Sequence, residues 1–378
     1  MGEPVFSLDR TRQFGGRPRS SRGPAGSSAM RGQGDRSATD SSRQAKSRGT
    51  LWRMPRSHEM QHRPADQLDT IDSAAGISRI RRGRGWRFLH PDGTSVRDVE
   101  DRMRILALGI PPAWKKVWIN PDPQAPVQAT GLDAAGRKQY RYHSAWREAR
   151  DEEKFAGLPA FAAHLPHLRA AVRKGLGSED PWERARAAAV RLLDGFAIRV
   201  GSSDSAARGS FGATTLLNRH ARISGDQIQL CFYGKHGIRA ELSGKDAALA
   251  AALAELKRAG SGDLFASRSG LRVRAADINQ WIAELTDGAG TAKTFRTWRA
   301  CAVAAGMLAR GRRTSVKTLL AEVARQLGNT PAVCRTSYVA PAFIDMAKAG
   351  RWIEHVPAEP KALRFNERAS LAVLNGKA

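Results

Sequence analysis

The chain has 378 residues, of which 62 are Lys or Arg and 36 are Asp or Glu, so its formal net charge is +26. Such an excess of positive charge indicates a polyanionic partner, either nucleic acid or an anionic membrane surface. The most apolar runs, such as CAVAAGMLA at 301–309, are shorter than the roughly 20 residues that cross a bilayer, and no apolar signal-peptide core follows Met1, so we exclude a membrane protein.

Residues 1–70 are rich in Ser, Gly, Arg and Gln and contain few aliphatic side chains. A segment of this composition buries too little apolar surface to offset the loss of chain entropy, so we expect it to be disordered. It could act as a polycationic arm. It could equally reflect a start placed upstream of the functional one, since Met54 and Met60 lie just before the first expected strand.

A small β-rich domain is expected over residues 77–150. Residues 85–96 (GWRFLHPDGTSV) predict two short strands around a Pro-Asp-Gly turn. Residues 99–110 predict a short amphipathic helix that is stopped by the two prolines after it. Three further strands, separated by Pro, Asp and Gly turns, are expected at 115–120, 126–131 and 138–143.

Residues 151–378 have mainly helical patterns. Asp180 is expected to cap a helix that starts at Pro181. A hairpin is expected at 227–242, where QIQLCFY and GIRAEL flank a Gly-Lys-His-Gly turn. Apolar residues at helical spacing predict later helices at 278–285 and 316–327. The whole pattern predicts an α+β fold, with a small β-rich N-terminal domain and a mainly α-helical C-terminal domain.

Four residues of the helical domain have the types that metal-free phosphodiester cleavage requires. Such a reaction needs a nucleophile that can hold the phosphoryl group, cations for the nonbridging oxygens and an acid for the leaving oxygen. Arginine suits the second task, because its planar guanidinium contacts phosphate bidentately and keeps its charge. The candidates are Arg199 after the capped helix, Lys235 in the hairpin turn, Arg296 in AKTFRTWRA, and Tyr338 on the helix that begins at Pro331.

Each candidate also has a structural interpretation. An arginine at a helix C-terminus complements the helix dipole. A lysine in a turn is usually solvated, an arginine between Phe and Trp can stack on the surface, and a tyrosine on a short helix can serve in packing. No candidate is specific by itself, and only their order along the chain favours chemistry.

Other site chemistries lack the residues that they need. The three cysteines, Cys231, Cys301 and Cys334, are too widely spaced for a disulfide framework or a zinc site. No GKS/T phosphate loop and no cluster of His, Asp and Glu is present in the sequence. We therefore expect neither a metal nor a nucleotide cofactor. The cysteine pattern also fits a reducing compartment.

The order Arg, hairpin Lys, Arg and Tyr, with a polar residue nine positions before the tyrosine, resembles that of the type IB DNA topoisomerases, especially their small bacterial and poxvirus-like branch. The resemblance covers about residues 77–350 and is carried by IPPAWKKVWI, QATGLDAAGRKQYRYH, GSFGATTL, TAKTFRTW and LGNTPAVCRTSY. It implies a two-domain clamp on double-stranded DNA that relaxes supercoils through a 3′-phosphotyrosyl intermediate, with no cofactor.

The resemblance also implies a role for each candidate. Tyr338 is expected to be the nucleophile and Lys235 the acid for the departing 5′ oxygen. The nonbridging oxygens are expected to contact Arg199, Arg296 and Asn329. Further DNA contacts are expected from Arg137, Lys138, Gln139, Tyr140, Arg141, Tyr142 and Lys293, although the strand residues among them could also be ordinary surface residues. We expect a monomer that acts in the cytoplasm, associated with the nucleoid.

Two alternatives remain open. Tyrosine recombinases share much of this order, but their second arginine usually follows a histidine by three residues, and Lys293 holds that place here. The other alternative is a DNA-binding relative with weakened or lost activity. In its favour, SSDSAARGS after Arg199 is one residue shorter than the NEEYARENGS of relatives, and Arg299 replaces a small residue or His. Asn329 also stands where many relatives have histidine, which we regard as a tolerated variant. A neutral amide can still donate to a phosphate oxygen.

Overall fold

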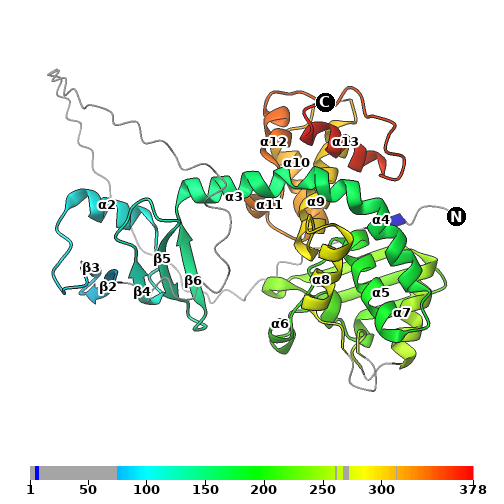
Figure 1. Ribbon diagram of the computed structural model, residues 1–378, viewed down its shortest axis with the longest axis horizontal. Coiled ribbons are helices and arrows are strands. Elements are labelled where there is room, and N and C mark those ends of the chain that lie inside the picture. Colours follow the sequence, from blue (N-terminus) through cyan, green and yellow to red (C-terminus); the bar gives the residue numbers. More distant parts are fainter. Residues whose placement is uncertain (1–4, 8–74, 260–261, 267–271, 312, 378) are drawn as a thin grey trace, which may run out of the picture. The chain divides into compact units, whose positions relative to one another are not determined.

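The computed structural model describes residues 5–7, 75–259, 262–266, 272–311 and 313–377. They form two compact units, one of residues 75–148 and one of residues 149–377 together with strand β1 (Val5–Ser7) (Figure 1). The fold is α+β, because each unit contains an antiparallel sheet and helices dominate the second unit. Among the described residues, no helix is both long and apolar enough to span a bilayer.

The first unit is built on a five-stranded antiparallel sheet with the strand order β3-β2-β4-β5-β6. Asp98 caps its helix α2 (Val99–Ala107) by accepting a hydrogen bond from the Asp101 amide at 2.8 Å. Ile105 is the buried residue of this helix and joins a small core with strand residues such as Ile77 and Ile119. The strands are β2 (Ile77–Arg82), β3 (Gly85–Leu89), β4 (Lys115–Ile119), β5 (Val127–Leu132) and β6 (Lys138–Tyr142).

The turn after β3 differs from the sequence expectation of two flanking strands. The Asp92 carboxylate accepts from the Thr94 amide at 2.8 Å, and Gly93 has a φ of 81°, a conformation that favours glycine. Beyond the turn, pairing is limited to one bridge between Leu89 and Ser95. The reason is that Asp98 already begins helix α2, so the chain leaves the sheet.

The second unit contains eleven α-helices among its described residues, and α3 begins before the unit boundary. Its antiparallel sheet has the order β1-β9-β8-β7, with β7 (Ala221–Ser224), β8 (Gln227–Tyr233) and β9 (Arg239–Lys245). The helices are α3 (Ser144–Ala156), α4 (Leu158–Leu176), α5 (Pro181–Phe196), α6 (Ser203–Ala207), α7 (Ala247–Ala259), α8 (Ala275–Leu285), α9 (Ala292–Leu308), α10 (Val316–Leu327), α11 (Pro331–Ser337), α12 (Pro341–Lys348) and α13 (Phe365–Leu374).

Helices α5 and α9 form the centre of this unit. Ten residues of α5 and twelve of α9 are buried. Helix α4 packs along α5, and α9 contacts α5, α10, α12 and α13. Helix α7 packs on β7 and β8 and also contacts α5, so the sheet is joined to the helical core on one side (Figure 1). Arg296 lies on α9 and Arg199 follows the end of α5, so these two helices carry two of the five candidate catalytic residues.

The expectation of disorder over residues 1–70 is wrong at Val5–Ser7. These three residues form β1, which pairs antiparallel with β9 in the register Val5 to Lys245 and Ser7 to Ser243. A strand of this kind is held by main-chain hydrogen bonds, which need no apolar composition, and it covers the open edge of β9. The rest of the segment, residues 1–4 and 8–70, lies outside the described residues.

Candidate active site

Arg199 follows the end of α5, where Ala197 adopts the left-handed conformation (φ 49°) and turns the chain out of the helix. The carbonyl oxygen of Arg199 accepts from the Ala213 amide at 2.8 Å, and that of Val200 accepts from Thr214 at 2.8 Å. These bonds fasten the backbone of Arg199 to the GSFGATTL segment.

The fastening depends on a close approach of two glycines. A Cβ built on Gly212 would lie 2.5 Å from the Arg199 carbonyl oxygen and 2.5 Å from the Gly201 amide nitrogen. Only a residue without a side chain fits there. The Arg199 and Val200 carbonyls are therefore held by hydrogen bonds although the loop between these glycines is one residue shorter than in relatives.

Arg296 links the two segments that carry Arg199 and Asn329. Its guanidinium lies on α9, is 2% exposed, and donates to the carbonyl oxygens of Ala197 and, at 3.0 Å, of Leu327. Each of these carbonyls lies two residues before a candidate. Arg296 thus positions both candidates while its own Nε has no hydrogen-bond partner among the described residues.

Asn329 contacts Arg199 directly. Helix α10 ends at Gly328 in the left-handed conformation (φ 61°), and Asn329 follows it, 5% exposed. Its side-chain oxygen accepts from Nη2 of Arg199 at 2.7 Å. The two residues are 130 positions apart in the sequence, and the fold brings their side chains into one hydrogen bond.

Tyr338 is the C-cap of α11 and lies beside Arg296, whose Cζ is 5.3 Å from the centre of the phenol ring. Burial raises the pKa of the phenol, but Arg296, which is both a charge and a hydrogen-bond donor to it, together with the charges of Arg199 and Lys293, brings the pKa below its ordinary value. The site therefore favours the phenolate form of Tyr338 more than water does.

The two arginines of the site repel each other. Burial and then the charge of Arg296 lower the pKa of Arg199 to about 10. Neither guanidinium forms an ion pair with a carboxylate among the described residues. An anion bound between them would relieve this repulsion, so the site has the electrostatics of a phosphate-binding site.

Lys235 lies in the turn between β8 and β9, in the short 3₁₀ segment Lys235–Gly237, and is exposed. The turn is closed by a hydrogen bond from the Gly237 amide to the Gly234 carbonyl at 3.1 Å. Lys235 lines a small pocket together with Arg199, Arg296 and Gly328. The fold thus brings the hairpin lysine to the two arginines.

The remaining DNA-contact candidates fall into two groups. Lys293 is exposed on the first turn of α9, one turn before Arg296, and its charge acts on Tyr338. The strand candidates lie in the first unit, where Arg137 and Gln139 bind the Asp133 carboxylate at 2.8 Å and 3.1 Å. Arg141 donates to the Gly109 carbonyl at 2.7 Å.

The other face of β6 carries Lys138, Tyr140 and Tyr142, since alternate residues of a strand share a face. The rings of Tyr140 and Tyr142 stack with their centres 5.9 Å apart, and Tyr142 stacks on Trp146 at 4.4 Å. The ammonium of Lys138 is 5.9 Å from the centre of the Tyr140 ring. Of the six strand candidates, these three best fit an aromatic and cationic surface.

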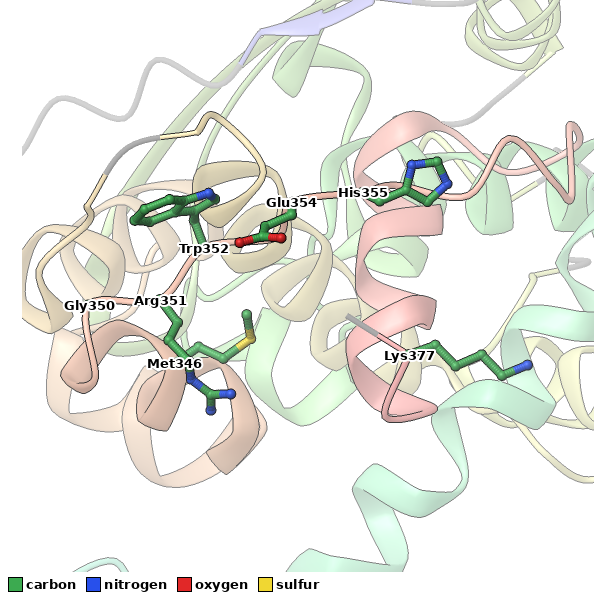
Figure 2. Close-up of a pocket in the computed structure, with 7 residues that line it drawn as sticks. All are labelled: Met346, Gly350, Arg351, Trp352, Glu354, His355 and Lys377. Carbon is green, nitrogen blue, oxygen red and sulfur yellow. The ribbon is translucent and has the colours of Figure 1, made fainter.

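A separate pocket lies near the C-terminal helix (Figure 2). It contains none of the five catalytic candidates, so we do not assign the reaction to it. Its lining residues are Met346, Gly350, Arg351, Trp352, Glu354, His355 and Lys377. Among the described residues, no group of three His, Cys, Asp or Glu side chains could hold a metal ion.

Sequence reasoning treated Arg299 only as a departure from relatives and missed what it contacts. Its half-buried guanidinium donates to the carbonyl oxygens of Asp194 at 3.2 Å and Gly195 at 2.6 Å, at the end of α5. The sequence signal that could have indicated these contacts is the three-residue spacing from Arg296, which puts both arginines on one side of α9. Together they hold the last turn of α5 and the exit that leads to Arg199.

Two family models and one relative match this chain. The family model described as the catalytic core of eukaryotic DNA topoisomerase I matches residues 143–345, which include all five catalytic candidates. The model of the bacterial DNA topoisomerase IB N-terminal domain matches residues 85–133. DNA topoisomerase 1B of Acanthamoeba polyphaga mimivirus is 30% identical over 308 residues, which are 75% of this chain and 92% of that protein.

Proposed function

Since the chain belongs to the type IB DNA topoisomerases, we propose that its relaxation of supercoiled DNA is carried out by Tyr338, Arg199, Arg296, Asn329 and Lys235. The observation that carries the proposal is that contacts join the four segments that carry these residues, with Lys235 lining one pocket with Arg199 and Arg296. Arg199 donates to Asn329 at 2.7 Å, and Arg296 lies against the ring of Tyr338 at 5.3 Å.

In the first step, the phenolic oxygen of Tyr338 attacks the scissile phosphorus. A 3′-phosphotyrosyl bond forms, and the bond from phosphorus to the 5′ oxygen breaks. The phenol loses its proton to solvent, a loss favoured by the lowered pKa of Tyr338. Lys235 gives a proton to the departing 5′ oxygen, which is otherwise a poor leaving group.

The two arginines stabilise the charge that develops on the nonbridging oxygens. The two guanidinium charges repel each other when no anion lies between them. The phosphorane-like transition state carries more negative charge on these oxygens, so it relieves the repulsion and is stabilised by the arginines more than by water. The oxygen of the Asn329 amide is fixed by Arg199, and the nitrogen of the same amide is the donor suited to a nonbridging oxygen.

Between the two steps the free 5′ end rotates and supercoils are released. The oxygen of the 5′ hydroxyl then attacks the phosphorus of the phosphotyrosine while Lys235 takes the hydroxyl proton. The bond from phosphorus to the Tyr338 oxygen breaks, the phosphodiester is restored, and the phenolate of Tyr338 regains a proton from solvent. Each step exchanges one phosphate ester for another, so the bond energy is conserved and no nucleotide is required. In this scheme a single chain supplies every catalytic group, so we propose that a monomer acts on cytoplasmic, nucleoid DNA.

DNA binding by the first unit is proposed to use the face of β6 that carries Lys138, Tyr140 and Tyr142. A lysine can neutralise a phosphate, and tyrosine hydroxyls can donate to phosphate oxygens. Arg137, Gln139 and Arg141 are also proposed as DNA contacts of this unit, where the Asp133 carboxylate and the Gly109 carbonyl orient their side chains.

The test is relaxation of a supercoiled plasmid in EDTA without ATP, beside Tyr338→Phe. We expect wild type to relax the plasmid and the variant to bind DNA but leave it supercoiled, because Phe keeps the ring and removes the oxygen that holds the phosphoryl group. Tyr233→Phe, at an exposed tyrosine of β8, is the matched control and should relax normally. Residual relaxation by Tyr338→Phe would remove Tyr338 from its role.

A further inference from the structure

The peptide groups on both sides of Tyr338 are anchored to other helices. The Ser337 carbonyl accepts from Nζ of Lys154 on α3 at 3.2 Å. The Tyr338 carbonyl accepts from Sγ of Cys301 on α9 at 3.6 Å. Burial raises the pKa of Cys301 to about 12, so its thiol keeps the proton that it donates. The main chain is thus fixed immediately before and after the phenol-bearing carbon.

Lys154 is itself a constrained side chain. It lies in the last turn of α3, in the same unit as Tyr338, and its side chain is 22% exposed. Its ammonium pairs with the Asp151 carboxylate at 2.7 Å and lies 4.2 Å from the centre of the Phe155 ring. With the Ser337 carbonyl it has three partners, so Lys154 is a held contact and not a solvated surface lysine.

The helix that carries the nucleophile needs such support. Helix α11 has seven residues, too few for a helix to be stable by its own hydrogen bonds. Its last carbonyl groups have no partner within the helix, and a cation near this end also interacts favourably with the negative pole of the helix dipole. The hydrogen bond from Lys154 satisfies one of these carbonyls, one residue before the nucleophile.

We propose that Lys154 is a positioning residue, which holds the Ser337 peptide and so keeps the phenolic oxygen of Tyr338 in line with the leaving 5′ oxygen. The inference rests on the proposed role of Tyr338. The charges that act on the phenol are those of Arg296, Arg199 and Lys293, so Lys154 works through the main chain. Placement errors of about 1 Å can cost roughly 10²-fold in rate.

The test uses single-turnover cleavage and religation of a DNA duplex by the full chain with Lys154→Met. Both rate constants should fall by the same factor, about 10- to 100-fold, because Tyr338 attacks in one direction and leaves in the other through one transition state. The equilibrium fraction of covalent complex, the DNA affinity and the melting temperature should stay at the control values. Lys154→Arg, which keeps a cationic donor, should recover most of the rate.

The matched control is Lys348→Met. Lys348 pairs with Asp345 at 2.9 Å with the same three-residue spacing, but among the described residues it makes no further hydrogen bond. The inference is wrong if Lys154→Met cleaves as fast as this control. It is also wrong if a lower melting temperature or weaker DNA binding accounts for the rate loss, or if Lys154→Arg is as slow as Lys154→Met. A wild-type protein that forms no adduct, or a Tyr338→Phe protein that does, would instead defeat the proposed catalytic site.

Discussion

At the scale of single residues, the candidate site is a set of cations that is held by neutral groups. Arg296 donates to the Ala197 and Leu327 carbonyls, and Arg199 donates to the Asn329 amide. Partial charges orient the guanidiniums without cancelling them, whereas a carboxylate would compete with phosphate. The arrangement therefore fixes the arginines in place and leaves their full charge for the DNA backbone.

Lys235→Ala is expected to slow cleavage of ordinary DNA by roughly 10²- to 10⁴-fold with little loss of DNA binding, because it removes the proposed general acid. A substrate with sulfur in place of the bridging 5′ oxygen needs no proton, since a thiolate leaves readily. On that substrate Lys235→Ala should cleave at nearly the wild-type rate. Single-turnover cleavage of both substrates measures the difference.

Two controls make this result specific. Arg199→Ala should stay slow on the sulfur substrate, because its task is to stabilise charge on the nonbridging oxygens. Lys245→Ala, at an exposed lysine at the far end of β9 in the same hairpin, should cleave both substrates normally. If sulfur does not rescue Lys235→Ala selectively, Lys235 is a phosphate contact or a turn residue and the acid lies elsewhere.

At the scale of elements, a buried ionic network fixes the helices behind the site. Arg169 on α4 donates to the Asp194 carboxylate on α5 at 2.9 and 3.0 Å, and to Glu367 on α13 at 2.6 and 3.0 Å. Burial raises the pKa of Asp194, but the charges of Arg169 and Arg364 outweigh it and bring that pKa well below its usual range. The network ties α4 and α13 to the last turn of α5, from whose end Arg199 emerges.

Glu367→Gln should lower the free energy of unfolding by about 3 kcal/mol, because it removes one charge from a buried group of ions and leaves arginine charge uncompensated. Glutamine keeps the shape and an acceptor for the Arg364 amide, which donates to the Glu367 carboxylate at 2.9 Å. Urea unfolding at neutral pH measures the change.

The matched control for this substitution is Glu322→Gln, at an acid of α10 that pairs with Arg325 at 2.8 Å in a partly exposed salt bridge. This change should cost less than about 1 kcal/mol. If the two substitutions lowered the free energy of unfolding equally, burial of the network would not determine how much it contributes to stability. A cost for Glu367→Gln within that range would contradict the predicted role.

At the scale of the whole molecule, the net charge of +26 is distributed over two compact units and a basic segment that precedes them. Within the described residues, strand β1 pairs with β9 and so belongs to the second unit although it opens the chain. In sequence order, the basic segment therefore connects strand β1 of the second unit to the first unit.

Deletion of residues 1–70 should weaken DNA binding mainly at low salt. Because fewer counterions are released, the plot of log affinity against log salt should become shallower by about 0.9 for each phosphate that the shortened chain no longer neutralises. Folding and cleavage should persist, since β9 keeps its longer partner β8. Deletion of residues 1–7 alone is the control, and it should leave the slope unchanged. An unchanged slope after the longer deletion would contradict a DNA-binding role for the segment.

Much of this protein was determined by its sequence alone. Period-two and period-3.6 apolar patterns predicted strands β4 to β6, the β8–β9 hairpin and helices α5, α8 and α10, because these patterns reflect local geometry. The caps at Asp180 and Gly328 are likewise local. The order of Arg199, Lys235, Arg296 and Tyr338 indicated the family, which the comparisons confirm.

The tertiary structure decided what depends on contacts between distant residues. No pattern near Arg296 indicates that its guanidinium binds the carbonyls of Ala197 and Leu327, since those partners are chosen by the packing of α9 against α5 and α10. The same holds for β1, whose pairing uses main-chain atoms that every sequence possesses. It holds also for Lys154, whose contact with Ser337 spans 183 residues. Local propensity fixes elements, but only the packed core determines which side chain meets which peptide group.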